Sequence, residues 1–126
     1  MGLDTYASRT PDDLTLTDED EAAFTAAHID LCGGVCSDGV TSIRGKVYND
    51  LVMEVSGISL YQEWTPPEEV RLIAAAFATR TPEELVSVWN DVDCRYGSDH
   101  ASSEAAALQV FFRVCADRGL GLIGWW

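Results

Sequence analysis

Three threonine–proline pairs constrain the fold of this chain more than any other feature of its sequence. They begin the stretches TPDD at Thr10, TPPE at Thr65 and TPEE at Thr81. Such a pair is typical of a helix start, because the hydroxyl accepts a hydrogen bond from an exposed backbone N–H and proline loses nothing at the first helical position. An acid three residues after the threonine completes a capping box, which we expect at Thr65/Glu68 and Thr81/Glu84.

Apolar residues recur at helical spacing along most of the chain and predict five helices. The first runs from about Thr17 to Leu31 and the second from about Thr41 to Val55. The third and fourth begin after the second and third threonine–proline pairs, and the fifth spans residues 102 or 103 to 118. Gly119 should adopt the left-handed conformation that ends many helices. The predicted fold class is therefore mainly α, a small irregular bundle of about five helices.

An α+β fold is the competing interpretation. Residues 50–61 read DLVMEVSGISLY and contain Val, Ile and Tyr, which favour strands, so a short hairpin around residues 50–61 is the runner-up. The apolar tail LGLIGWW is expected either to return over the core or to form an edge strand. A chain of 126 residues fits a single domain, residues 1–126, in which residues 1–16 are expected to form an extended or partly ordered N-terminal arm.

Negative charge is high and unevenly distributed. The chain has 21 acids against eight Lys and Arg, which gives a net charge of −13. Residues 1–38 hold nine of the acids and one base, and six of these acids lie between Asp12 and Glu21. Such a surface repels phosphate backbones and anionic lipid, so we expect neither direct nucleic-acid binding nor membrane binding. A basic protein surface is the expected partner, and a solvated face that only maintains solubility explains the same charge.

The stretch HIDLCGGVC places His28, Cys32 and Cys36 at steps of four and makes them weak candidates for a metal or thiol site. On a continuous helix, His28 and Cys32 would share a face. Zinc needs four ligands, usually in pairs such as C-x2-C, and the other soft ligands are scattered along the chain at Cys94, His100 and Cys115. The two glycines after Cys32 are expected to end the helix. Packing by small residues at a helix end is the favoured interpretation, with no metal and no cofactor.

Tryptophan at the end of the chain is a second candidate for interaction. Trp125 and Trp126 are consecutive, and Trp64 precedes a pair of prolines. Tryptophan is enriched at binding hot spots, but it is also the largest core residue. Both interpretations remain open for all three side chains.

No nucleophile elbow or phosphate-binding glycine loop is present in the sequence, and no leader resembling a secretory signal begins it. We therefore expect a non-enzymatic, cytoplasmic protein that binds and inhibits or regulates a basic, nucleic-acid-engaging protein. Nuclease inhibitors, immunity proteins and phage anti-defence proteins fit this description. Two other hypotheses remain open: a small metal- or thiol-dependent protein using His28, Cys32 and Cys36, and a viral structural or assembly component. The residues expected to bind the basic partner are Asp12, Asp13, Asp18, Glu19, Asp20 and Glu21.

Overall fold

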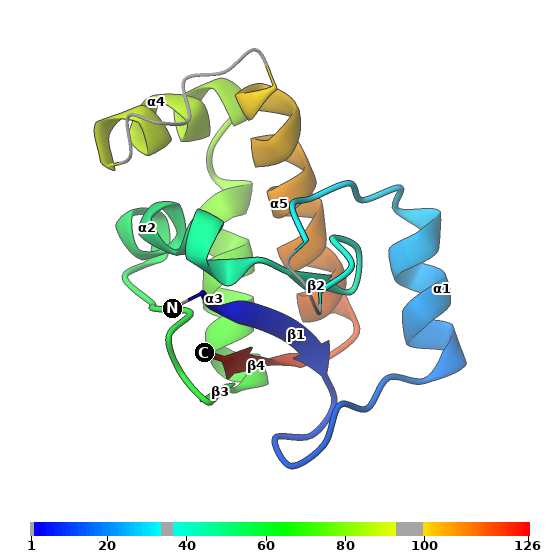
Figure 1. The fold of residues 1–126 in the computed structure, drawn as a ribbon. Helices are drawn as coiled ribbons and strands as arrows, with labels where there is room; N and C mark the ends of the chain where they lie inside the picture. The colour runs from blue at the N-terminus through cyan, green and yellow to red at the C-terminus, as the bar shows by residue number, and fades with distance from the viewer. Residues whose placement is uncertain (1, 34–36, 93–99) are drawn as a thin grey trace.

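The computed structural model describes residues 2–33, 37–92 and 100–126. Helices predominate in these ranges and surround one small sheet (Figure 1). The helices are α1 (Asp18–Ala26), α2 (Gly45–Ser56), α3 (Pro67–Ala78), α4 (Pro82–Val92) and α5 (Ala101–Asp117). The strands are β1 (Asp4–Ser8), β2 (Ser42–Ile43), β3 (Trp64–Thr65) and β4 (Gly121–Trp125).

The sheet joins the two ends of the described chain. Its strand order is β2-β1-β4-β3, and every neighbouring pair is antiparallel. The central pair, β1 and β4, runs from Asp4 opposite Trp125 to Ser8 opposite Gly121. The first and last strands therefore lie side by side, and Figure 1 shows both chain ends on the same side of the molecule.

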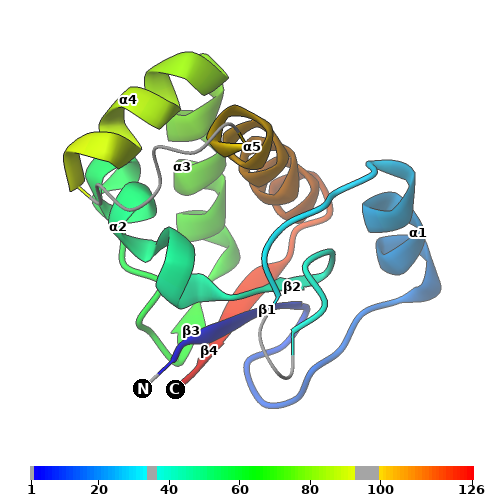
Figure 2. The same cartoon turned by 45° about the horizontal axis from the view of Figure 1, so that its top comes forward.

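The helices cover one side of this sheet. Figure 2 shows α2, α3 and α5 above it, with α4 farther from the strands. The most extensive helix–helix contact is between α3 and α5, followed by the contact of α4 with α5. Helix α1 stands apart from the others and contacts α5, where the rings of Phe24 and Phe111 have centroids 5.8 Å apart.

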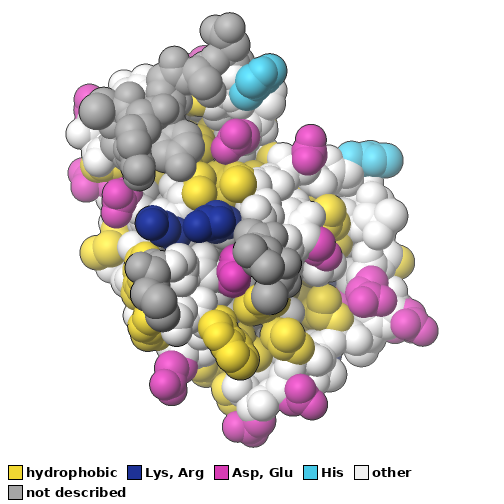
Figure 3. Space-filling view, in the orientation of Figure 1, with side chains coloured by type: hydrophobic (Ala, Val, Ile, Leu, Met, Phe, Trp, Pro, Cys, Tyr) yellow, Lys and Arg dark blue, Asp and Glu magenta, His cyan; other side chains and the backbone are white. Residues whose placement is uncertain are grey.

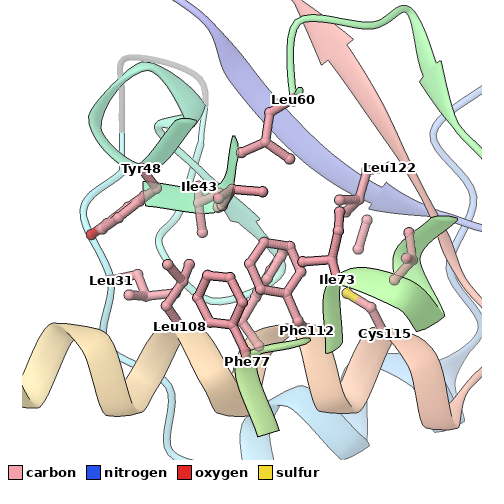
Figure 4. Close-up of a cluster of buried hydrophobic side chains, with 14 of the residues drawn as sticks. Leu31, Ile43, Tyr48, Leu60, Ile73, Phe77, Leu108, Phe112, Cys115 and Leu122 are labelled. Atoms are coloured by element: carbon pink, nitrogen blue, oxygen red, sulfur yellow. The ribbon is translucent and has the colours of Figure 1, made fainter. Parts of the chain in front are cut away.

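The hydrophobic core fills the space between the sheet and the helices (Figure 4). Phe77 of α3 meets Phe112 of α5 edge-on, with ring centroids 5.3 Å apart and planes at 61°. Both rings are fully buried, as are Ile73 of α3 and Leu122 of β4. The apolar stripes of α3 and α5 thus account for much of the core, and burying them is the main source of stability of such a domain.

The predicted helical fold is confirmed, and three helices follow the sequence closely. Helices α3, α4 and α5 begin and end within about two residues of the expected positions. The capping box at Thr81/Glu84 is present, with backbone–side-chain distances of 3.1 and 3.2 Å. Gly119 has φ +69°, and Leu120 N–H donates to the Cys115 carbonyl oxygen at 2.9 Å, as in a Schellman end.

The other two threonine–proline pairs differ from their predictions. Helix α3 does begin after Thr65, at Pro67, but without the expected capping box. Thr65 lies buried in β3, where its backbone pairs with Leu122, and the N-cap of α3 is Pro66 without a side-chain cap. Strand pairing therefore replaces the capping box expected at Thr65. Residues 10–13 form no helix; Thr10 Oγ1 instead donates to the backbone oxygen of Asp13 at 3.0 Å within a loop.

The remaining differences concern helix ends and strand positions. Helix α1 ends at Ala26 instead of Leu31, and α2 begins at Gly45, after β2. The runner-up hairpin around residues 50–61 is wrong because α2 continues to Ser56. The sheet of the α+β alternative does exist, but distant segments form it. The tail is a strand in the interior of the sheet, because β4 has β1 on one side and β3 on the other.

Candidate functional site

An acidic loop connects β1 to α1 and is held by backbone contacts to buried Ser8. The Ser8 hydroxyl accepts from the Thr15 backbone N–H at 3.0 Å and lies 2.9 Å from the Asp13 carbonyl oxygen. The Arg9 N–H donates to the Thr15 carbonyl oxygen at 2.8 Å, which closes the loop. The side chains of Asp12 and Asp13 are left exposed to solvent.

The first turn of α1 continues this negative surface. Thr17 is the N-cap, and its hydroxyl accepts from the Asp20 backbone N–H at 3.1 Å. Asp18, Glu19 and Glu21 are exposed in the turn that follows. Acids at a helix N-terminus interact favourably with the helix dipole, so this part of the charge also stabilises α1.

Asp20 has a different environment from the other acids of this run. Its side chain is fully buried and accepts two hydrogen bonds from Arg9, from Nε and Nη2, each at 2.6 Å. Arg118, which follows α5, donates from Nε at 2.9 Å, and the Thr17 N–H donates at 2.9 Å. These contacts define the Asp20 ion-pair cluster, which consists of Arg9, Asp20 and Arg118.

The pKa of Asp20 reflects this cluster. Burial alone would raise the pKa of the carboxyl, because it disfavours the charged form. Hydrogen bonds from Arg9, from Thr17 and from Arg118 outweigh burial and hold the pKa well below its usual range. Asp20 is therefore ionised at neutral pH, and its charge is neutralised inside the protein.

The sequence grouped Asp20 with five other acids as partner-binding residues, and the structure separates it from them. Asp20 is 0% exposed, so it is inaccessible to a partner. None of the other five forms an ion pair with a cation in the described residues. We call these five the acidic surface: Asp12, Asp13, Asp18, Glu19 and Glu21. Figure 3 shows one face of the molecule, with carboxylates scattered over it and Lys and Arg in one small group.

A second candidate is a cavity of about 500 Å³ between the segment after α1 and the start of α5. Both histidines of the chain, His28 and His100, line it, together with Asp30, Cys32 and Glu104. His28 has φ +54°, a left-handed conformation that is uncommon for residues other than glycine. The predicted helical relation of His28 to Cys32 is wrong because α1 ends at Ala26, yet the fold places both side chains on this cavity.

Tyr48 connects the two walls of this histidine cavity. Its hydroxyl accepts from the Cys32 backbone N–H at 2.8 Å and donates to Glu104 Oε2 at 3.2 Å. Its ring is fully buried against Trp89, and Figure 4 shows its oxygen directed away from the apolar cluster. Burial, followed by the nearby Glu104 carboxylate, raises the pKa of Tyr48 against the opposing hydrogen bond from Cys32, so the hydroxyl remains protonated and can donate.

The arrangement of side chains around the histidine cavity gives little support to the metal hypothesis. Among the described residues, no group of three or more His, Cys, Asp or Glu side chains is arranged to hold a metal ion. Cys32 is an exposed free thiol. Cys115 is buried in the core, where burial raises the pKa of its thiol. The other two cysteines, Cys36 and Cys94, lie outside the described residues.

Comparison of the chain with protein-family models, with curated proteins and with solved structures finds no match. Within the described ranges, no helix combines the length and the apolar character that crossing a bilayer requires. Function must therefore be inferred from the side chains themselves. Sequence reasoning found the acidic surface, but it missed the grouping of Asp30, His100 and Glu104 with His28, because these residues carry no spacing signal.

Proposed function

We propose that this chain is a non-enzymatic, acidic interaction protein that binds the basic surface of another protein and thereby inhibits or regulates it. The proposed partner engages nucleic acid, and the expected compartment is the cytoplasm. The observation that supports the proposal best is the exposure of five carboxylates on one loop and one helical turn, without ion-pair partners among the described residues. They are the acidic surface defined above.

Electrostatics favour such a partner. Carboxylates gathered on one loop and one helical turn repel one another, and cations on a partner would relieve that repulsion. The Asp20 ion-pair cluster holds both ends of the acidic loop, since Arg9 begins the loop and Asp20 lies in the following helix. A surface that is already ordered loses less conformational entropy on binding. Attraction at long range would also make association fast and sensitive to salt.

The test compares capture of proteins from a host lysate by the immobilised chain and by charge-reversed variants. In the first variant Asp12, Asp13 and Glu21 are replaced by lysine. These positions are chosen because their carboxylates take no part in the capping box at Thr17. We expect capture at low salt to be strongly reduced, and we expect high salt to release the partner from the unmodified chain.

A matched control reverses three exposed acids elsewhere. Asp50, Glu54 and Asp117 are exposed on α2 and α5. Each acid-to-lysine change adds two charges, so both triple variants shift the net charge from −13 to −7. Equal capture by the two variants would show that overall charge alone matters, and undiminished capture by the first would refute the proposed surface. Circular dichroism of both variants checks that the fold survives.

Thiol- or metal-dependent function is the second candidate, supported by the placement of both histidines and Cys32 around one cavity. Elemental analysis of purified protein, combined with thiol titration, tests it directly. Stoichiometric zinc or iron that is lost in a His28→Ala, Cys32→Ser variant would favour this function over the acidic surface.

A further inference from the structure

Three aromatic side chains are exposed together at one end of the sheet. Trp125 is 71% exposed, Trp126 49% and Tyr61 40%. We call Tyr61, Trp125 and Trp126 the aromatic surface. The sequence left open whether the tryptophans belong to the core, and their exposure excludes that role for Trp125 and Trp126. Large aromatic side chains exposed as a group are typical of binding sites, where tryptophan and tyrosine supply much of the affinity.

The aromatic surface is held by the sheet and by side-chain contacts. The rings of Tyr61 and Trp126 meet edge-on, with centroids 5.8 Å apart and planes at 64°. Gly124 N–H donates to the Glu63 carbonyl oxygen at 3.2 Å, which joins the end of β4 to the segment that carries Tyr61. Tyr61 and Trp126 therefore support each other before any ligand arrives, which lowers the entropy lost on binding.

A carboxylate lies beside the two tryptophans. A cavity of about 430 Å³ is lined by Pro11, Glu63, Trp125 and Trp126, together with Ile123 and Gly124. Glu63 is exposed, and Pro11 directly precedes Asp12 and Asp13 of the acidic surface. Among the described residues, no Lys or Arg lines this cavity.

Indole faces beside a carboxylate suit one side chain in particular. The guanidinium of arginine is planar, stacks on aromatic rings and pairs with a carboxylate through two parallel hydrogen bonds. The ammonium of lysine is more strongly hydrated and offers no planar face for stacking. Charge complementarity favours a cation of either kind, and the planar face with its two parallel hydrogen bonds favours arginine over lysine.

We propose that the aromatic surface is the docking site for an arginine-rich segment of the basic partner. An arginine side chain of that segment stacks on Trp125 or Trp126 and pairs with Glu63, while flanking cations face Asp12 and Asp13. This inference rests on the proposed function and adds to it the anchor residues and the preferred basic side chain of the partner.

The test measures binding of two labelled peptides of equal length, oligoarginine and oligolysine, to the full chain by fluorescence anisotropy. We expect oligoarginine to bind several-fold to about tenfold more tightly, because only its side chains stack on the indoles. Replacing Trp125 and Trp126 by alanine should remove this preference, and Glu63→Gln should reduce it. Replacing both tryptophans by phenylalanine keeps aromatic faces in place and should retain part of the preference. Leu72→Ala removes an exposed apolar side chain from α3 and should change nothing.

The outcomes separate this inference from the proposed function. Equal affinity for the two peptides, or an arginine preference that survives in the double alanine variant, overturns the docking site. If, in addition, replacing Asp12, Asp13 and Glu21 by lysine abolishes binding of both peptides, the result supports the acidic surface as a binding site that does not need the tryptophans. If that triple variant binds both peptides normally while the double alanine variant loses the preference for arginine, the result supports the docking site and refutes a binding role for the acidic surface.

Discussion

Arg118 donates a hydrogen bond from Nε to Oδ1 of Asp20 at 2.9 Å, across 98 positions of the chain. Arg9 binds the same carboxylate through both of its oxygens. The residue after β1, the first turn of α1 and the residue after α5 therefore meet at one buried anion. This cluster attaches the acidic loop and α1 to the rest of the protein, so the acidic surface depends on a carboxylate that does not belong to it.

The first prediction concerns stability. Asp20→Asn keeps the shape of the side chain but removes its charge, and hydrogen bonds to charged groups contribute about 1.5–3 kcal/mol. We expect the free energy of unfolding, measured with urea, to fall by about 2 kcal/mol. Asp18→Asn, in the same helical turn but exposed, is the matched control and should change the free energy by less than about 1 kcal/mol. Equal effects of the two substitutions would contradict the structural role of Asp20.

The second prediction concerns acid. The pKa of Asp20 in the folded protein lies below the usual value of 3.8 for an unperturbed aspartate, because the hydrogen bonds from Arg9, Thr17 and Arg118 outweigh burial. A lowered pKa stabilises the fold above the unfolded value, and this stabilisation disappears as the pH falls through the folded value. We therefore expect the free energy of unfolding to decrease as the pH is lowered from about 5 to about 2.

Asp20→Asn supplies the control for this pH dependence. In the variant, the decrease in the free energy of unfolding over the same pH range should be smaller. It should not vanish, because the pKa of Asp38 is also lowered: hydrogen bonds from Val40, Thr41 and Ser42 outweigh its burial. Urea denaturation of the unmodified protein and of the variant at a series of pH values measures how the free energy of unfolding of each depends on pH. Parallel curves for the two proteins would show that Asp20 does not control acid stability.

The sequence predicts local features of this fold better than distant ones. Helices α3, α4 and α5 follow from apolar residues at helical spacing and from local end signals such as Thr81 and Gly119. The sheet has no comparable local signal. Two of its strands have two residues each, and its central pair joins the two ends of the described chain. Pairings between distant segments depend on the packed core and leave no periodic pattern in the sequence.

The candidate sites differ in the same way. Six clustered acids are obvious in the sequence, and among them Asp20 stands three residues after Thr17, the same capping-box spacing as at Thr81 and Glu84. That spacing does not predict its burial, because the ion-pair cluster also needs Arg118 at the other end of the described chain. The exposure of Trp125 is likewise a tertiary property, since a core and a surface tryptophan look identical in the sequence. The histidine cavity is not predictable from the sequence either, because only the folded chain brings His28 and His100 to one cavity.

The third prediction tests the contacts of Tyr48. Tyr48→Phe keeps the buried ring but leaves the Cys32 N–H and the Glu104 carboxylate without this hydroxyl. We expect the free energy of unfolding to fall by about 1–2 kcal/mol, and we expect faster hydrogen exchange at Cys32. Tyr61→Phe is the control, because Tyr61 is exposed, and it should change stability by less than about 0.5 kcal/mol. An unchanged exchange rate at Cys32 in Tyr48→Phe would contradict the connection.

The fourth prediction compares two thiols. Cys32 is exposed, whereas Cys115 lies in the core between α5 and the sheet, where burial raises the pKa of its thiol (Figure 4). Alkylation requires both access and the thiolate, so iodoacetamide should modify Cys32 in the folded protein and Cys115 only after unfolding. Mass spectrometry of the two peptides measures each rate separately. Cys115→Ser should lower the free energy of unfolding by about 1–3 kcal/mol, because it places a hydroxyl among apolar side chains, and Cys32→Ser should leave stability unchanged. Alkylation of both cysteines at the same rate under native conditions would mean that α5 does not pack against the sheet as described.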